Sequence, residues 1–235
     1  KDIAPQLLQN DVDVILGGGK KYFSDDLLNK EKQDGYEIVS DAKSLKNIEK
    51  TDKLIGLFAE DSLSPELDRE STDEPSLKEM TAAAINVLSN DKDGFFLMVE
   101  GSQIDWAGHA NDAAWAMKDA EAFEKAVEAA LDFSKKDKKT LVVIAGDHDT
   151  GGMSVGGYGG SGANLEILKN GTATGDFMAS QLNEERSNIQ EVVLKYTDVT
   201  LSETEVNQIK QASNPAFQIN SIISKHALVG WTHTG

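Results

Sequence analysis

Two apolar runs separated by one long helical segment constrain the fold of this chain more than any other feature. The first run, GFFLMVEG, covers residues 94–101, and the second, TLVVIAG, covers residues 140–146. Between them, residues 111–135 place apolar side chains three and four positions apart, the spacing of a helix. Apolar strands joined by a helix are typical of a parallel sheet that is covered on both faces. We therefore predict an α/β protein built as a three-layer α/β/α sandwich with a mostly parallel sheet.

Shorter patterns predict further elements. Residues 12–16 and 53–59 are apolar runs of strand length, and residues 75–88 have helical periodicity. The sequences SNIQ from Ser187 and SETE from Ser202 both match a capping box, which predicts a helix start at each.

Changes in composition and in local sequence pattern divide the chain into three parts. Residues 1–150 carry the apolar runs and are expected to form the sheet region with candidate metal ligands at the strand ends. Residues 151–228 begin with a glycine-rich loop and continue in short helical pieces, which indicates an insertion. Residues 229–235 are expected to return to the main sheet and to bring the last ligand.

The formal net charge of -17 excludes several functions. A surface this acidic repels DNA and RNA, so nucleic-acid binding is not expected as a function. It also repels phosphate esters, so any phosphate chemistry would require bound cations.

The absence of cysteine excludes disulfides and zinc held by thiolates. No apolar run approaches the roughly 20 residues that a membrane-spanning helix needs, so we expect no transmembrane segment.

Acids and histidines follow the predicted strands, where ligands bind in open α/β sheets. Glu100 ends the first run, and Asp105 and His109 follow it four residues apart, a spacing that places both on one helix face. Asp147 and His148 follow the second run directly. Each group also has a plain interpretation: a solvent-facing glutamate, a capping aspartate beside a surface histidine, or a polar turn. Together, oxygen and nitrogen donors without sulfur suit zinc, or magnesium where carboxylates dominate.

Four stretches of the sequence resemble the alkaline phosphatase family. Residues 99–112 (VEGSQIDWAGHAND) resemble its long metal-binding signature, and Asp147-His148 resembles its second signature. Residues 231–235 (WTHTG) resemble the third, and residues 13–19 match a structural strand and loop. The matches come in family order and span residues 11–235, so the resemblance covers nearly the whole chain.

The resemblance implies roles for individual residues. Asp105, His109 and His233 match the protein ligands of a first zinc ion, and Asp147 and His148 match two ligands of a second. His233 carries no signal without this match.

The same match pairs Glu100 with a magnesium ligand. The family hydrolyses phosphate monoesters through a phosphoserine intermediate, and its two zinc ions activate the serine and stabilise the leaving group. This would supply the cations that an acidic protein needs to attract phosphate.

Departures from the family pattern are also informative. The family's catalytic serine follows an aspartate upstream of the matched region, whereas the only Asp-Ser pair here is Asp61-Ser62, after the glycine loop of residues 17–19. The two arginines, Arg69 and Arg186, do not match the family's phosphate clamp. We therefore expect a carboxyl-terminal part of an alkaline phosphatase, truncated before the nucleophile, partial in its fold and inactive alone.

The resemblance also implies partners and a location. It predicts phosphate monoesters and inorganic phosphate as ligands, a homodimer in the parent protein, and a secreted, periplasmic or extracellular location. Two alternatives stay open: a zinc-binding fragment without turnover, and a related phosphodiesterase or sulfatase-superfamily hydrolase.

Overall fold

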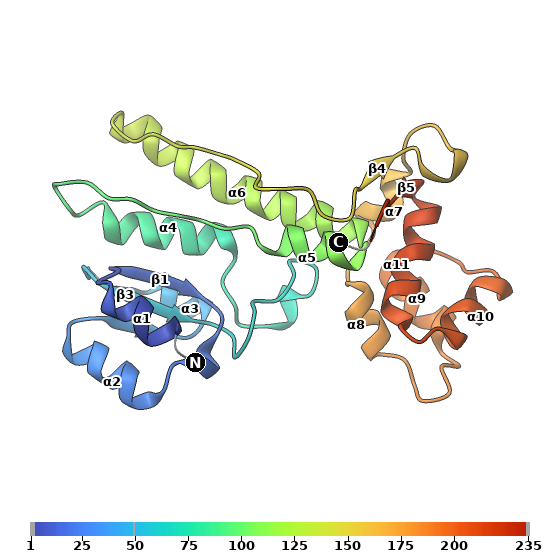
Figure 1. Ribbon diagram of the computed structural model, residues 1–235, viewed down its shortest axis with the longest axis horizontal. Helices are drawn as coiled ribbons and strands as arrows, with labels where there is room; N and C mark the ends of the chain where they lie inside the picture. The colour runs from blue at the N-terminus through green and yellow to red at the C-terminus, as the bar shows by residue number, and fades with distance from the viewer. Residues whose placement is uncertain (1–2, 49, 234–235) are drawn as a thin grey trace. The chain divides into compact units, whose positions relative to one another are not determined.

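A computed structural model describes residues 3–48 and 50–233, arranged in two compact units (Figure 1). Unit 1 comprises Lys1–Ser64, Arg69–Glu100 and Ala122–Val143. Unit 2 comprises Pro65–Asp68, Gly101–Glu121 and Ile144–Gly235. Thr234 and Gly235, which complete the third family motif, lie outside the described residues.

A parallel three-stranded sheet forms the centre of unit 1. Its strands are β1 (Val14–Gly17), β2 (Glu37–Val39) and β3 (Leu54–Leu57), in the order β1-β3-β2. Ile55 of the central strand is in register with Ile15 on one side and Ile38 on the other. The strands predicted at residues 12–16 and 53–59 are confirmed.

Successive residues of a strand point to opposite sides, so these apolar strands give the sheet two apolar faces. Helices cover both of them. On one face, Ile15, Ile38 and Ile55 pack with residues of α1 (Ile3–Gln9) and α2 (Asp25–Gln33). On the other face, Val14, Val39 and Leu54 pack with residues of α3 (Ala42–Lys46) and α4 (Leu77–Leu88). The predicted three-layer α/β/α architecture is therefore confirmed, as is the helix predicted near residues 75–88. Two 3₁₀ turns, η1 (Lys20–Tyr22) and η2 (Arg69–Ser71), complete the regular structure of unit 1 besides its part of α6.

The two apolar runs that led to this prediction are not strands themselves. Residues 94–101 and 140–146 are extended segments to which no strand is assigned (Figure 1). The exposed fraction is 90% at Phe96, 69% at Met98 and 85% at Leu141. A strand requires a hydrogen-bonded neighbour, and neither run is paired with any strand within residues 3–48 and 50–233. The strand prediction at these two places is wrong for that reason.

Unit 2 is mainly helical. It contains α5 (Gln103–Ala110) and the first part of α6 (Ala113–Asp137), whose later residues belong to unit 1. Its remaining helices are short and pack around an apolar core that includes Ile189, Val193, Ile209 and Ile219. They are α7 (Leu165–Lys169), α8 (Gly175–Ser180), α9 (Ile189–Thr197), α10 (Glu203–Gln211) and α11 (Pro215–His226). A 3₁₀ turn, η3 (Gly157–Gly159), precedes α7.

One short pair of strands accompanies these helices. Strand β4 (Ser154–Val155) pairs antiparallel with β5 (Val229–Gly230). Among the described residues, β5 thus belongs to a sheet separate from β1-β3-β2. The division of the chain at residues 151 and 229 stays a prediction.

Of the two predicted capping boxes, one is present. At α10, Ser202 Oγ accepts from the Glu205 amide, and Glu205 Oε2 accepts from the Ser202 amide at 2.8 Å. At α9, the N-cap is Asn188 instead of Ser187. Gln190 does not complete a box there, because its Oε1 accepts from the Leu201 amide at 2.9 Å.

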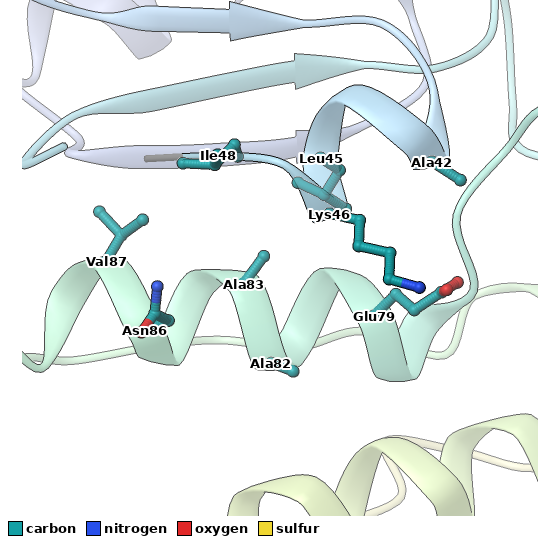
Figure 2. Close-up of a pocket in the computed structure, with 9 residues that line it drawn as sticks. All are labelled: Ala42, Leu45, Lys46, Ile48, Glu79, Ala82, Ala83, Asn86 and Val87. Atoms are coloured by element: carbon teal, nitrogen blue, oxygen red, sulfur yellow. The ribbon is translucent and has the colours of Figure 1, made fainter. Parts of the chain in front are cut away.

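A cavity of about 260 Å³ lies between α3 and α4 in unit 1 (Figure 2). Its walls are mostly apolar, with Leu45, Ile48, Ala83 and Val87 among the lining residues. Lys46 and Glu79 line it as well, and the Glu79 carboxylate is the capping-box partner of Ser76 at the start of α4. None of the candidate metal ligands lines this cavity.

Within residues 3–48 and 50–233, none of the helices combines the length and the hydrophobicity that a membrane span requires.

The central strand offers a direct test of this fold. Ile55 is fully buried between the helices of one face and its strand neighbours. Replacing it by alanine leaves a cavity, so Ile55→Ala should lower the free energy of unfolding by about 2–5 kcal/mol in urea titrations followed by circular dichroism. Ile3→Ala removes the same atoms from a side chain that is 73% exposed and should change it little. Equal losses in both variants would contradict the assigned core.

Candidate metal centre

Helix α5 carries the first pair of candidate ligands. Asp105 and His109 lie one turn apart on one face, and His109 Nε2 is 3.4 Å from Asp105 Oδ2. Both side chains are partly solvent-exposed, at 34% for Asp105 and 54% for His109. The spacing seen in the sequence therefore brings a carboxylate and an imidazole together at a surface that solute can reach.

Asn111 ends α5 and ties it to the carboxyl-terminal segment. Its backbone is left-handed, with φ of 49°, a conformation that asparagine tolerates better than most residues. Its buried amide Nδ2 donates to Gly108 O at 3.2 Å and to His233 O at 2.9 Å. One side chain thus closes the helix and holds the main chain of the third candidate motif.

Asp112 then begins α6. Its Oδ1 accepts from the Trp115 amide and its Oδ2 from the Gly175 amide, both at 3.0 Å. Burial raises the pKa of this carboxyl, and the backbone donors oppose the rise. The Asp112 side chain, which accepts from the Trp115 amide, therefore caps the start of α6.

The loop after residue 146 carries the second pair. The His148 amide donates to Asp147 Oδ1 at 3.0 Å, and this hydrogen bond holds the pKa of the Asp147 carboxyl below its ordinary value. The His148 ring faces two carboxylates. Its Nε2 is 3.3 Å from Asp147 Oδ2, and its Nδ1 is 4.0 Å from Asp105 Oδ1.

Thr150, a residue that was not predicted from the sequence, joins the two pairs. Its hydroxyl donates to Asp105 Oδ1 at 2.5 Å and lies 3.2 Å from His148 Nδ1. Its place two residues after His148 is the only sequence signal that could have drawn attention to it. A hydroxyl that contacts two candidate ligands from different segments belongs to the same site.

Glycines allow these segments to meet. A Cβ on Gly108, between the two ligands of α5, would lie 2.5 Å from Thr150 O. A Cβ on Gly151, whose φ is +85°, would lie 2.6 Å from Gly108 O and 2.9 Å from the Trp231 ring. The backbones of α5 and of the 147–151 loop therefore approach each other where neither has a side chain.

The third segment docks on the same loop. The amides of Thr232 and His233 both donate to Gly151 O, at 3.0 and 3.3 Å. Together with the Asn111 amide, this places the His233 backbone beside α5 and the 147–151 loop.

The structure therefore brings some of the predicted ligands together. Asp105 lies beside His109 and His148, Asp147 lies beside His148, and the His233 backbone is held to the same segments. Glu100 is exposed at the end of an extended segment in unit 1. Among the described residues, no three histidine or acidic side chains converge on one ion position. Carboxylates and imidazoles fit zinc by chemical type and as facing pairs, so the ligand sets stay a prediction.

The chain is similar to known proteins of one family. The alkaline phosphatase family matches residues 1–235. Alkaline phosphatase 3 of Bacillus subtilis is 43% identical over 240 residues, which cover 95% of this chain and 51% of the relative. The chain thus spans about half the length of these curated relatives.

Solved structures agree. A cold-active alkaline phosphatase from a psychrophilic Shewanella species superimposes with a TM-score of 0.89 and 34% identity, over 99% of this chain and 59% of that one. A variant of TAB5 alkaline phosphatase, solved with magnesium in its M3 site, matches 66% of this chain and 46% of its own at a TM-score of 0.55 and 34% identity.

The contact at Gly108 can be tested by substitution. In an ordinary helix, Gly→Ala stabilises by about 1 kcal/mol. Here the new Cβ would displace the Thr150 backbone, so Gly108→Ala should lower the melting temperature and weaken zinc binding measured by isothermal titration calorimetry. Gly146→Ala is the matched control, since no atom lies within 4 Å of a Cβ at that position. A stabilised Gly108→Ala protein with unchanged zinc affinity would contradict the close packing.

Proposed function

Because this chain belongs to the alkaline phosphatase family, we propose that it supplies part of the metal centre of an enzyme that hydrolyses phosphate monoesters. The observation that carries this proposal is the pair of facing carboxylate–imidazole contacts, Asp105 with His109 and Asp147 with His148. They lie on two segments that Thr150 joins. Carboxylate and imidazole are the donors that zinc takes in catalytic sites that lack cysteine.

We assign the ligands in two groups. Asp105, His109 and His233 would hold one zinc ion, and Asp147 and His148 would hold a second. The hydrogen bonds that fix the His233 backbone support its inclusion in the first group.

Glu100 would serve a magnesium ion. Support for this role comes from its place in the family motif and from its exposed carboxylate. The magnesium reported in the TAB5 variant belongs to that protein, and it makes a magnesium role in this family reasonable to test here.

Electrostatics gives an independent reason to expect cations. The chain carries 40 acidic and 23 basic residues, so a phosphate dianion meets a repulsive surface. Bound zinc would reverse the local charge and polarise the phosphate ester and the attacking oxygen. The chain's own contribution is to hold the carboxylates and imidazoles in place before the ions arrive.

We further propose that the 235-residue chain alone does not turn over. The proposed reaction passes through a phosphoserine, and the only Asp-Ser pair is a poor candidate for its nucleophile. Asp61 forms an ion pair with Lys21, and its carbonyl accepts from the Gly19 amide, so Asp61-Ser62 belongs to a surface loop after β3 in unit 1. The complete enzyme is proposed to act as a homodimer outside the cytoplasm, as a secreted or periplasmic protein.

Zinc binding tests the ligand assignment. Titration of the metal-free chain with zinc should reveal about one tightly bound ion, held by the first group of ligands. Asp105→Asn keeps the shape of the side chain but removes the charge, and it should abolish tight binding. Asp132→Asn, at an exposed carboxylate paired with Lys135 on α6, is the control and should bind as the unmodified chain does. Equal zinc binding in all three proteins would contradict the assignment.

Hydrolysis of 4-nitrophenyl phosphate tests the inactivity of the isolated chain. With zinc and magnesium added, its rate should equal that of Asp105→Asn within error, because we assign no residue of this chain as the nucleophile that forms the phosphoserine. A zinc-dependent rate that Asp105→Asn abolishes would show that this chain is an enzyme by itself, and its loss in Ser62→Ala would identify the nucleophile. If the chain hydrolysed a phosphodiester or a sulfate ester faster than 4-nitrophenyl phosphate, the result would favour a related hydrolase of the superfamily.

A further inference from the structure

The Thr150 hydroxyl occupies a position between two candidate ligands that come from different segments. It donates to Asp105 Oδ1 at 2.5 Å and lies 3.2 Å from His148 Nδ1. The first distance is typical of a hydroxyl that donates to an ionised carboxylate. Such a hydrogen bond commits the single proton of the hydroxyl to Asp105.

Because this proton is given to Asp105, the Thr150 hydroxyl has a defined hydrogen-bonding role towards His148. A hydroxyl has one proton to donate and lone pairs with which to accept. With its proton given to Asp105, Thr150 can only accept from His148, so Nδ1 must carry the ring proton. A neutral imidazole has one N–H, and Nε2 then bears a lone pair.

A second contact requires the same tautomer. His148 Nδ1 lies 3.3 Å from the backbone carbonyl of Asp149. A carbonyl oxygen can only accept, so this contact too is favourable only if Nδ1 is protonated. Two independent acceptors, one a side chain and one the backbone, therefore face the same ring nitrogen.

The opposite ring nitrogen of His148 faces a carboxylate. His148 Nε2 lies 3.3 Å from Asp147 Oδ2, and the Asp147 carboxylate already accepts from the His148 amide through Oδ1. If Nε2 is unprotonated, two electron-pair donors face each other across this gap. A cation between them would turn a repulsive contact into two bonds.

We propose that Thr150 is a positioning residue that fixes His148 as its Nδ1–H tautomer, so that Nε2 together with Asp147 Oδ2 is left free to bind a divalent cation. This inference rests on the proposed function, because it assigns a role to a residue that does not itself bind the metal. Partners that fix the tautomer of a ligating histidine commonly change metal affinity by about 10–100-fold when they are removed.

Nuclear magnetic resonance tests the tautomer without any metal. The 235-residue chain is labelled with ¹⁵N-histidine, treated with a chelator and studied about two pH units above the ordinary histidine pKa of about 6.5. Long-range ¹H–¹⁵N correlations distinguish a protonated Nδ1 from a protonated Nε2, and the His148 signal is identified by its loss in His148→Gln. We expect the Nδ1–H pattern in the unmodified chain.

Two substitutions at Thr150 isolate the hydroxyl. Thr150→Val keeps the branched shape and removes the hydroxyl, so the His148 signal should shift towards Nε2–H, which can donate to Asp147. Thr150→Ser keeps the hydroxyl and should restore the Nδ1–H pattern. His226, whose Nε2 lies 2.9 Å from Glu205 Oε1, serves as an internal control and should be unchanged in both variants.

Zinc titration of the same proteins separates the two levels of the proposal. At the second site, formed by Asp147 and His148, Thr150→Val should weaken zinc binding by about 10-fold or more, and Thr150→Ser should restore it. An Nε2–H tautomer in the unmodified chain, or an Nδ1–H tautomer that survives in Thr150→Val, would overturn the role of Thr150 whatever the zinc result. The expected tautomers with no zinc binding at the site of Asp147 and His148 in any of the proteins would uphold that role and count against this second metal site.

Discussion

The close approach of two backbones, at Gly108 in α5 and at Thr150 in the 147–151 loop, is the contact on which the candidate site depends. It is possible only because Gly108 has no side chain. Asp105 and His109 belong to one partner in this contact, and His148 belongs to the other. The carboxyl-terminal segment then docks on the carbonyl of Gly151, so three stretches that are distant in sequence share one surface.

The sequence predicted the local parts of this arrangement and missed the non-local ones. The four-residue spacing of Asp105 and His109 is a property of any helix, and it was sufficient to predict that these side chains meet. The contact of Thr150 with Asp105 joins residues 45 positions apart, and no periodicity encodes it. The same distinction applies to strands: apolar runs predicted β1 and β3 correctly, but residues 94–101 and 140–146 are equally apolar and have no assigned strand partner among the described residues. Pairing depends on a neighbour, which a single run does not specify.

The net charge of the chain and the local geometry of the candidate site affect the binding of ions in different ways. A net charge of -17 disfavours an anionic substrate everywhere on the surface. The facing pairs concentrate negative charge and lone pairs at a few atoms, and cations bind most strongly at such places. Hydrogen bonds from the His148 amide and the Thr150 hydroxyl hold these carboxylates in position. A general electrostatic disadvantage is thus compatible with a site that becomes attractive to phosphate once cations are bound.

The two extended apolar segments also bear on how this chain behaves inside a cell. Phe96, Met98, Leu141 and Val143 present large hydrophobic side chains to solvent along backbones that lack strand partners in the described structure. Extended, apolar and unpaired segments are the features that chaperones recognise on nascent chains, and they also seed intermolecular association when left uncovered. During synthesis, residues 94–101 leave the ribosome before residues 140–146, so the earlier run is exposed to other molecules while α6 is still being translated. The yield of this chain in a recombinant host should therefore depend on chaperone supply and on the rate of translation as much as on the stability of its two units.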